Sequence, residues 1–341
     1  MTPLTLPIDL AGWLTYIEAQ HPKSIAMGLD RVNEVKQRLK LSPDFPIITV
    51  AGTNGKGSAC AMLERIYHEA GYRVACYSSP HLLRYNERVR IGCQEASDEA
   101  LCNAFLAVEA ARGETLLTYF EFGTLATMWH FMHADVDVAI LEVGLGGRLD
   151  AVNAFEPACA IVTSIDLDHM DFLGNSRESI GYEKAGVFRP GIPAICGDIN
   201  PPSTLVHDAG SIGADLMLVG RDFEFKLTGG SWTYHQGQTE IDHLPLPALI
   251  GDFQLFNAAC VITAIEALQQ LLPVTATTIA TGLRTATLAG RFQLYSSRPQ
   301  VILDVAHNPH AASALAENLR KLPSHGRTLA VFAMLADKNI V

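Results

Sequence analysis

Three absences narrow the class of protein first. The chain has 25 Lys and Arg against 36 Asp and Glu, which gives a net charge of -11 and disfavours a nucleic-acid or anionic-membrane partner. No window approaches the roughly 18 to 20 apolar residues that a membrane-spanning helix needs. Residues 1–14 lack a basic segment and include Asp9, so no signal peptide is expected.

Cysteine usage sets a further limit on the class of protein. The seven cysteines are scattered and form no Cys-x-x-Cys pair, so neither a disulfide framework nor a zinc site is predicted. We expect reduced, mostly buried thiols in a cytoplasmic protein. With 341 residues, 48% of them hydrophobic, the chain is long enough for two globular domains.

Short apolar runs alternate with amphipathic stretches over the first two thirds of the chain. Strands are predicted at 47–51, 74–77, 136–142, 158–165 and 194–196. Helices are predicted at 59–71, 98–112, 123–133 and 177–188. This alternation predicts an α/β fold, a doubly wound and mostly parallel sheet covered by helices on both faces.

The pattern changes beyond this sheet. Residues 216–241 predict a small antiparallel appendage, and helices follow at 253–272 and 277–283. A second, Rossmann-like α/β unit starts near Arg291, with strands at 293–295, 301–305 and 328–332 and a helix from Pro309. We therefore predict a first domain over 1–290 and, over 291–341, the start of a second domain that is incomplete.

Residues 50–58 read V-A-G-T-N-G-K-G-S between a predicted strand and a predicted helix. Glycines let the backbone turn sharply and point N–H groups at a phosphate, and the helix N-terminus adds its dipole. Lys56 supplies a charge for the β and γ oxygens, and Ser58 a hydroxyl near a metal. The match to G-x-x-x-x-G-K-[ST] is imperfect, because Gly57 and Val50 depart from it. The alternative is a chance Gly-rich turn, but the strand–loop–helix context favours a nucleotide-phosphate site.

Six further motifs follow the loop in order. They are S-S-P-H-L at 78–82 with N-E-R at 86–88, T-Y-F-E-F-G-T at 118–124, E-V-G-L-G-G-R-L-D-A-V-N at 142–153, D-H at 168–169 with L-G at 173–174, E-K-A-G at 183–186, and D-V-A-H-N-P at 304–309. The set resembles the folylpolyglutamate synthase branch of the Mur-ligase superfamily, in particular the bacterial dihydrofolate synthase/folylpolyglutamate synthase family.

The resemblance implies an ATP site on both sides of Arg291. Its residues would be Gly52, Thr53, Asn54, Gly55, Lys56, Gly57, Ser58, Asn257, Arg291, Asp304 and His307. Lys56 and Arg291 would be catalytic, stabilising charge on the transferred phosphoryl group. Read alone, Asn257 and Arg291 are equally ordinary solvated residues.

The resemblance also implies Mg²⁺, with two ions expected and with Ser79, Glu142 and His169 as ligands. Glu142 ends a strand, where ligands of open α/β sheets bind. Lys184 would be carbamylated, which turns a cation that repels Mg²⁺ into a carboxylate-like ligand. Without the resemblance, His169 reads as a packed or surface histidine and Lys184 as an exposed helical lysine.

A pterin pocket is implied by three segments. They contribute Ala26, Met27 and Gly28, then Thr118, Tyr119, Phe120 and Glu121, then Leu149, Asp150 and Ala151. Phe120 offers a face on which a flat heterocycle can stack, although an aromatic residue at this spacing is equally a core residue.

The activity implied is an ATP-dependent carboxylate–amine ligase that forms an amide through an acyl phosphate. Its substrates would be L-glutamate with 7,8-dihydropteroate or with the γ-carboxyl of a reduced folate, and we expect one chain to serve both reactions as a monomer. Two alternatives stay open, a cell-wall Mur-type ligase acting on a UDP-sugar peptide and a nucleotide-switched binding protein. A further alternative is an inactive chain with an incomplete second domain.

Overall fold

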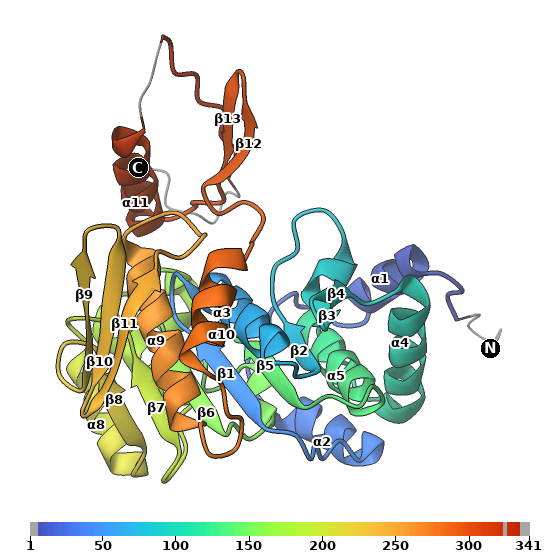
Figure 1. Ribbon diagram of the computed structural model, residues 1–341. Helices are drawn as coiled ribbons and strands as arrows, with labels where there is room; N and C mark the ends of the chain where they lie inside the picture. The colour runs from blue at the N-terminus through green and yellow to red at the C-terminus, as the bar shows by residue number, and fades with distance from the viewer. Residues whose placement is uncertain (1–5, 323–325, 335–341) are drawn as a thin grey trace.

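The computed structural model describes residues 6–322 and 326–334. Its centre is an eight-stranded sheet in the order β4-β3-β2-β5-β1-β6-β7-β8 (Figure 1). Six strands run parallel: β2 (Val74–Tyr77), β5 (Val138–Glu142), β1 (Ile47–Ala51), β6 (Cys159–Val162), β7 (Pro193–Cys196) and β8 (Asp215–Leu218). Two antiparallel strands form one edge, β3 (Val89–Ile91) and β4 (Gln94–Glu95). The predicted doubly wound α/β fold is confirmed.

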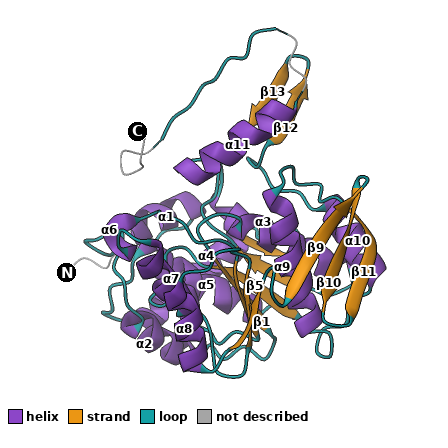
Figure 2. Ribbon diagram, turned by 90° about the vertical axis from the view of Figure 1, so that its left-hand side faces the viewer, coloured by secondary structure: helices purple, strands orange, loops and turns teal. Residues whose placement is uncertain are grey.

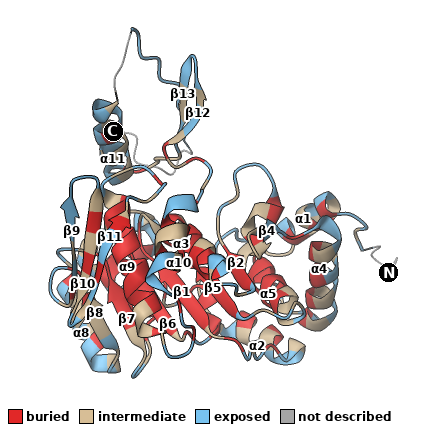
Figure 3. Ribbon diagram, in the orientation of Figure 1, coloured by how far each residue is buried: buried red, intermediate tan, exposed pale blue. Residues whose placement is uncertain are grey.

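Helices bury both faces of this sheet (Figure 3). One face is covered by α1 (Leu10–Glu18), α2 (Asp30–Leu39), α4 (Asp98–Arg112), α5 (Tyr119–Met132), α7 (Arg177–Ala185) and α8 (Ser203–Ile212). The other is covered by α3 (Lys56–Glu69), α9 (Phe253–Ala267) and α10 (Ala276–Thr285). In β1, Ile47 and Ala51 pack on the first face and Ile48 and Val50 on the second, because successive strand side chains point to opposite sides.

An antiparallel sheet lies beside α9 and α10 (Figure 2). It consists of β9 (Phe223–Thr228), β10 (Ser231–Gln236) and β11 (Thr239–Pro245). Trp232 and Tyr234 are fully buried under it, and Phe225 packs edge-on against Phe256 of α9 with ring centroids 4.8 Å apart. The appendage was predicted from residue 216. Leu216 lies instead in β8, because its apolar run extends the buried parallel sheet.

Two helices, α3 and α5, begin at least three residues earlier than predicted, for reasons visible in their caps. α3 begins at Lys56 because Gly55, at φ 88°, turns the chain directly from the loop into the helix. α5 begins at Tyr119 because Thr118 and Glu121 form a reciprocal capping box. Both shifts matter for the site, since they place the loop and residues 118–121 at helix N-termini. Short helices complete the main body: η1 (Tyr85–Arg88), η2 (Ala151–Ala154) and α6 (Met170–Leu173).

The C-terminal part projects from one end of the main body (Figure 1). It comprises the hairpin β12 (Gln293–Ser297) and β13 (Gln300–Leu303) and the helix α11 (Pro309–Lys321). Among the residues that the structure describes, the two strands pair antiparallel and only with each other. Residues 328–332, predicted as a strand, form neither strand nor helix, and Leu329 and Phe332 are exposed. A strand requires a neighbour to pair with, and the described residues supply none there.

Across the described ranges, no helix is both long and apolar enough to cross a membrane. The seven cysteines are all free thiols, five of them buried.

Close packing of α10 on α3 generates a stability prediction. A Cβ at Gly282 would lie 2.4 Å from Ile66 Cγ1 and 2.7 Å from Ile66 Cα. We expect Gly282→Ala to lower the free energy of unfolding by about 1–3 kcal/mol, because backbone must move. Gly210→Ala on α8 is the matched control: with no atom within 4 Å of its Cβ, it should raise stability by about 0.5–1 kcal/mol. Chemical denaturation measures both, and shifts of the same sign would contradict the packing argument.

Candidate active site

The phosphate loop is held by the neighbouring strand. Gly52, at φ 144°, approaches so closely that a Cβ would lie 2.0 Å from Thr163 Oγ1. Asn54 N donates to Ser164 Oγ (3.1 Å), and the hydroxyls of Thr163 and Ser164 donate to Asn54 O at 2.7 and 3.0 Å. Thr53 N donates to Ser164 O at 2.7 Å. These bonds fix the loop without a ligand.

Lys56 opens α3 with its side chain folded over the loop. Its Nζ donates to the carbonyl oxygens of Gly52 (3.0 Å) and Thr53 (3.1 Å). The ammonium therefore lies at the loop mouth, beside the helix N-terminus, where both favour an anion.

Behind the loop, α9 contributes a buried polar chain. Asn257 Nδ2 donates to Gln254 Oε1 (3.0 Å), and Gln254 Nε2 donates to Ser58 Oγ (3.2 Å). Asn257 also limits Gly55, whose Cβ would lie 2.4 Å from Asn257 Oδ1. Gln254 was not among the predicted site residues, although its spacing three residues before Asn257 on one helix face signalled it.

Glu142 lies at the carboxyl end of β5 and is buried. Its Oε2 accepts from Ser79 N (3.1 Å). Burial raises the pKa of Glu142, while Lys56, the Ser79 N–H and Arg291 oppose that shift. Gly57 lies between the charges: a Cβ there would be 3.8 Å from both Glu142 Oε1 and Arg291 Nη2. The residue that departs from the usual loop pattern thus keeps space open at this carboxylate.

Lys184 is buried, not exposed on its helix. Burial first, and then the nearby charge of Lys56, lower its pKa to about 7, while Asp168 and Asp150 oppose the shift. Burial also raises the pKa of Asp150 to about 6, although the N–H groups of Leu145 and Val152 donate to its carboxylate. A substantial fraction of Lys184 is therefore a neutral amine near pH 7.

The loop after β6 carries the histidine predicted as a metal ligand. His169 is in the left-handed region (φ 49°) and precedes α6. Asp168 Oδ1 accepts from His169 N at 2.9 Å, and His169 Nε2 lies 3.9 Å from the same oxygen. Asp168 and His169 line the same cavity as the phosphate loop.

The C-terminal part supplies the opposite wall. Asp304 accepts from Phe292 N and Ala306 N, both at 2.8 Å, which fixes it beside Arg291. Burial lowers the pKa of Arg291, and the carboxylates of Glu142 and Asp304 oppose the shift. His307 Nε2 lies 3.8 Å from Asp168 Oδ2. Residues before and after Arg291 in the sequence thus lie close together.

One cavity of about 900 Å³ joins these groups to the predicted pterin residues. Its lining includes the site residues predicted from the sequence except Gly28 and Tyr119. Gly28 N donates to Leu149 O (3.4 Å), and the Tyr119 ring packs edge-on against Tyr85.

At the pterin end, Glu121 is held by Arg31, whose Nη2 lies 2.7 Å from Glu121 Oε1. The Phe120 ring lies over Gly144, where a Cβ would come within 2.7 Å of its Cζ. Phe120 is partly buried and lines the cavity, so its ring is both a packing residue and a face offered to a ligand.

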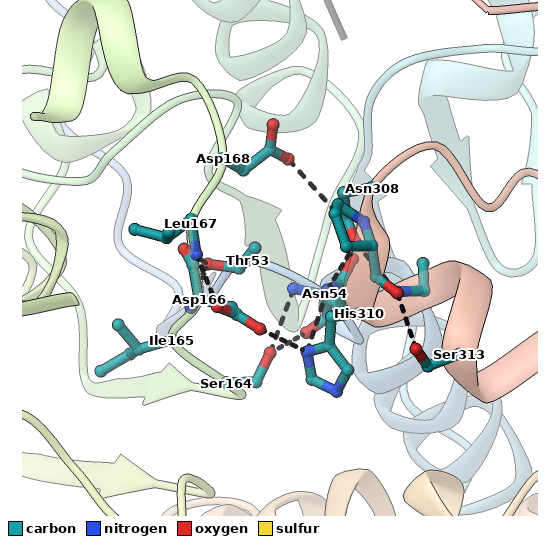
Figure 4. Close-up of polar contacts among 12 residues, drawn as sticks. Thr53, Asn54, Ser164, Ile165, Asp166, Leu167, Asp168, Asn308, His310 and Ser313 are labelled. Carbon is teal, nitrogen blue, oxygen red and sulfur yellow. Dashed lines mark hydrogen bonds and ion pairs between the residues drawn. The ribbon is translucent and has the colours of Figure 1, made fainter. Parts of the chain in front are cut away.

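Sequence reasoning also missed the residues that connect the two parts. Asn308 and His310 contact the loop residue Asn54 and the β6–α6 loop (Figure 4). Both lie within or next to the D-V-A-H-N-P motif, but nothing in one sequence indicates which residue they meet about 250 positions away.

Comparison with known proteins identifies the class of protein. The Mur ligase middle domain matches residues 50–265, and the Mur ligase glutamate ligase domain matches residues 290–340. Fold and site thus define a Mur-type ligase.

Similar proteins and solved structures identify the family within this class. The dihydrofolate synthase/folylpolyglutamate synthase of Escherichia coli K12 is 48% identical over 332 residues, which are 97% of this chain and 77% of the relative. The structure of E. coli FolC in complex with DHPP and ADP superimposes with a TM-score of 0.93, over 98% of this chain and 79% of that one, at 48% identity. A bifunctional folylpolyglutamate synthase/dihydrofolate synthase with Mn, AMPPNP and L-glutamate bound gives 0.87, over 93% and 76%, at 46% identity. The chain belongs to the dihydrofolate synthase/folylpolyglutamate synthase family.

The tight loop generates a binding prediction. Gly55→Ala places a Cβ against Asn257 at a left-handed φ, and we expect ADP to bind at least about tenfold more weakly, because the loop must shift. Gly71→Ala is the matched control, since Gly71 has nearly the same φ (91° against 88°) with no atom within 4 Å of its Cβ. It should lose stability but keep ADP affinity. Isothermal titration measures both, and equal affinity losses would refute the local explanation.

Proposed function

We propose that this chain is an ATP-dependent ligase that joins L-glutamate to 7,8-dihydropteroate and to the γ-carboxyl of reduced folates. One observation supports this above the others. A single cavity runs from the phosphate loop, past Glu142 and Lys184, to Phe120 and Glu121, in a chain of this family. A carboxylate bound at the far end would thereby meet a phosphoryl donor at the near end.

The chemistry requires activation, because a carboxylate oxygen is a poor leaving group. The acceptor carboxylate attacks the γ-phosphorus of ATP, ADP leaves, and an acyl phosphate forms. The amine of L-glutamate then attacks the acyl carbon, loses a proton, and releases phosphate. Positioning and charge neutralisation supply most of the catalysis in such transfers.

Lys56 and Arg291 are the cations suited to this task. Both lie near Glu142 at the loop mouth, and Arg291 is partly buried, so its charge is less screened there than in open solvent. Asp304 holds the backbone beside Arg291. The C-terminal part thus positions one of the two cations.

Mg²⁺ fits the residues present. Glu142 and Ser79 can offer hard oxygen ligands, and both line the cavity together with His169. Within the described ranges, no three His, Cys, Asp or Glu side chains form a ready metal cage. That suits an ion that takes few protein ligands and completes its shell with water and phosphate oxygens. When bound, Mg²⁺ would neutralise phosphate charge. We propose that two ions bind. We also propose that the metal is Mg²⁺, whereas the related structure contains Mn.

Lys184 would carry a carbamate. Its neutral amine is the form that attacks CO₂, and the low pKa makes this form abundant at neutral pH. The resulting anion would remove a cation from beside Lys56 and provide a further oxygen ligand. This accounts for a buried lysine that forms no ion pair within 4.0 Å among the described residues.

Water must be excluded while the acyl phosphate exists. We infer that the C-terminal part closes on the main body during turnover. We also propose that the enzyme is a monomer and cytoplasmic. The cavity provides no specific support for a UDP-sugar ligase or a nucleotide switch, the two alternatives raised by the sequence.

Substrate dependence of ATP turnover tests the activity. We expect phosphate release with Mg²⁺ that requires L-glutamate and proceeds with either dihydropteroate or tetrahydrofolate, because one cavity serves both acceptors. Coupled phosphate detection measures it, and mass spectrometry identifies the added glutamate. Release without either substrate would support the switch, and turnover with one acceptor alone would reject the two-reaction proposal.

The carbamate has its own test. With ¹³C-bicarbonate at pH 8, we expect a carbamate carbon signal by NMR that disappears in Lys184→Met, together with nearly all ligase activity. The signal should weaken as pH falls below about 7, because protonation of the amine removes the nucleophile. Lys40→Met, at an exposed helix end, is the control. An unchanged signal in Lys184→Met would place the carbamate elsewhere.

A further inference from the structure

The start of α11 lies directly on the phosphate loop. Asn308 Nδ2 donates to Asn54 Oδ1 (3.0 Å), and Asn54 Nδ2 donates to Asn308 Oδ1 (3.4 Å) (Figure 4). The two side-chain amides, 254 residues apart, therefore exchange a pair of hydrogen bonds. We call Asn54 and Asn308 the amide pair.

Asn308 has two tasks that require different atoms. Its Oδ1 also accepts from Ala311 N at 2.9 Å and so caps α11. Its Nδ2 faces Asn54 and, at 3.5 Å, Asp168 Oδ2. The side chain is buried at 6% exposure, where an unpaired polar group is costly. Only a side chain with a donor and an acceptor on one carbon, an amide, meets both tasks.

The loop does not need the amide pair for its own shape. Asn54 N donates to Ser164 Oγ (3.1 Å), and both Thr163 Oγ1 and Ser164 Oγ donate to Asn54 O. Asn54 is thus fixed by its backbone, and its side chain is a fixed docking point. The amide pair instead positions residues 304–308 and α11 relative to the loop.

A second contact supports the same placement. His310 Nδ1 lies 3.3 Å from Asp166 Oδ2, and Asp166 N donates to Thr53 Oγ1 at 3.0 Å. This contact is about half exposed on both sides, so its strength is small. The buried amide pair is the stronger determinant.

We propose that Asn308 is a positioning residue for phosphoryl transfer: through Asn54 it sets the segment 304–308 against the phosphate loop. Asp304, which fixes the backbone beside Arg291, and His307 lie on this segment and line the cavity. The amide pair thereby keeps the C-terminal wall in register with the bound phosphates. The inference rests on the proposed ligase activity.

Two substitutions separate positioning from helix capping. Ser and Asp cap helices about as well as Asn, so capping alone predicts wild-type behaviour for both Asn308→Ser and Asn308→Asp. The amide pair predicts a graded loss. Asn308→Ser removes the donor to Asn54, whereas Asn308→Asp also turns an acceptor toward Asn54 Oδ1 and a negative charge toward Asp168. We expect kcat to fall roughly tenfold in the first and up to about a hundredfold in the second, as misplacement does.

The control breaks another contact of the same helix. Lys321 Nζ lies 2.5 Å from Asp252 Oδ2, with the two side chains 56% and 77% exposed. Lys321→Ala should leave kcat near wild type, because exposed ion pairs contribute little.

The measurements are kcat and KM for ATP, the affinity for ADP, the melting temperature, and hydrogen–deuterium exchange over residues 304–312. We expect a fall in kcat with little change in ADP affinity or melting temperature, because the loop keeps its own anchors, and faster exchange in both Asn308 variants. The proposal would be overturned if both variants kept the wild-type kcat and exchange rate. It would also be overturned if Asn308→Ser and Asn308→Asp lowered kcat equally and in proportion to the melting temperature. Exchange needs no turnover, so it tests the amide pair even if wild-type protein shows no ligase activity and the proposed function fails.

Discussion

The contact between the phosphate loop and the end of β6 determines the rest of the site. Gly52 lies so close to Thr163 that no side chain fits, and the hydroxyls of Thr163 and Ser164 bind the loop carbonyl at Asn54. The N–H groups of Thr53 and Asn54 also bind Ser164, and α3 starts at Lys56 as a direct continuation of the loop. Because β1 and β6 are adjacent parallel strands, the loop after β1 and residues 163–164 after β6 lie side by side at the same edge of the sheet.

The site brings buried and partly buried charges of both signs together, since carboxylates such as Glu142 and Asp168 line the same cavity as the cations. A chain with a net charge of -11 places Lys56, Lys184 and Arg291 around one cavity. Burial opposes the charged forms of Glu142, Lys184 and Arg291 alike, so each group is less stable there than in water. Burial of apolar side chains in the two layers on either face of the sheet offsets this cost. A phosphate and a metal ion would supply the missing charges, so the same arrangement that costs stability favours the charged ligands.

The sequence predicted the elements whose signals are local. β2 and α4 match residue for residue, because apolar runs and N-caps such as Ser97 define them. The phosphate loop and Glu142 followed from position relative to strands, and the remaining ligand assignments followed from the family resemblance. Long-range relations were out of reach. Nothing near Lys184 in the sequence reveals that its helix buries it, and no local signal pairs Asn308 with Asn54. The strand expected at 328–332 failed for the same reason, because pairing depends on a neighbour rather than on propensity.

The way α11 attaches to the main body is compatible with the proposed closure of the C-terminal part. Among the described residues of α11, Asn318 is the buried one, and the helix presents no fully buried apolar side chain to the main body (Figure 3). The polar contacts around this helix include the amide pair, His310 with Asp166, and Lys321 with Asp252. Hydrogen bonds of this kind are directional but contribute only about 1 kcal/mol each, since water replaces them on opening. A large apolar interface would make separation of the two parts costly in free energy. A polar interface defines one closed arrangement and can still separate at low cost. Exchange of substrates and products from a deep cavity requires both properties.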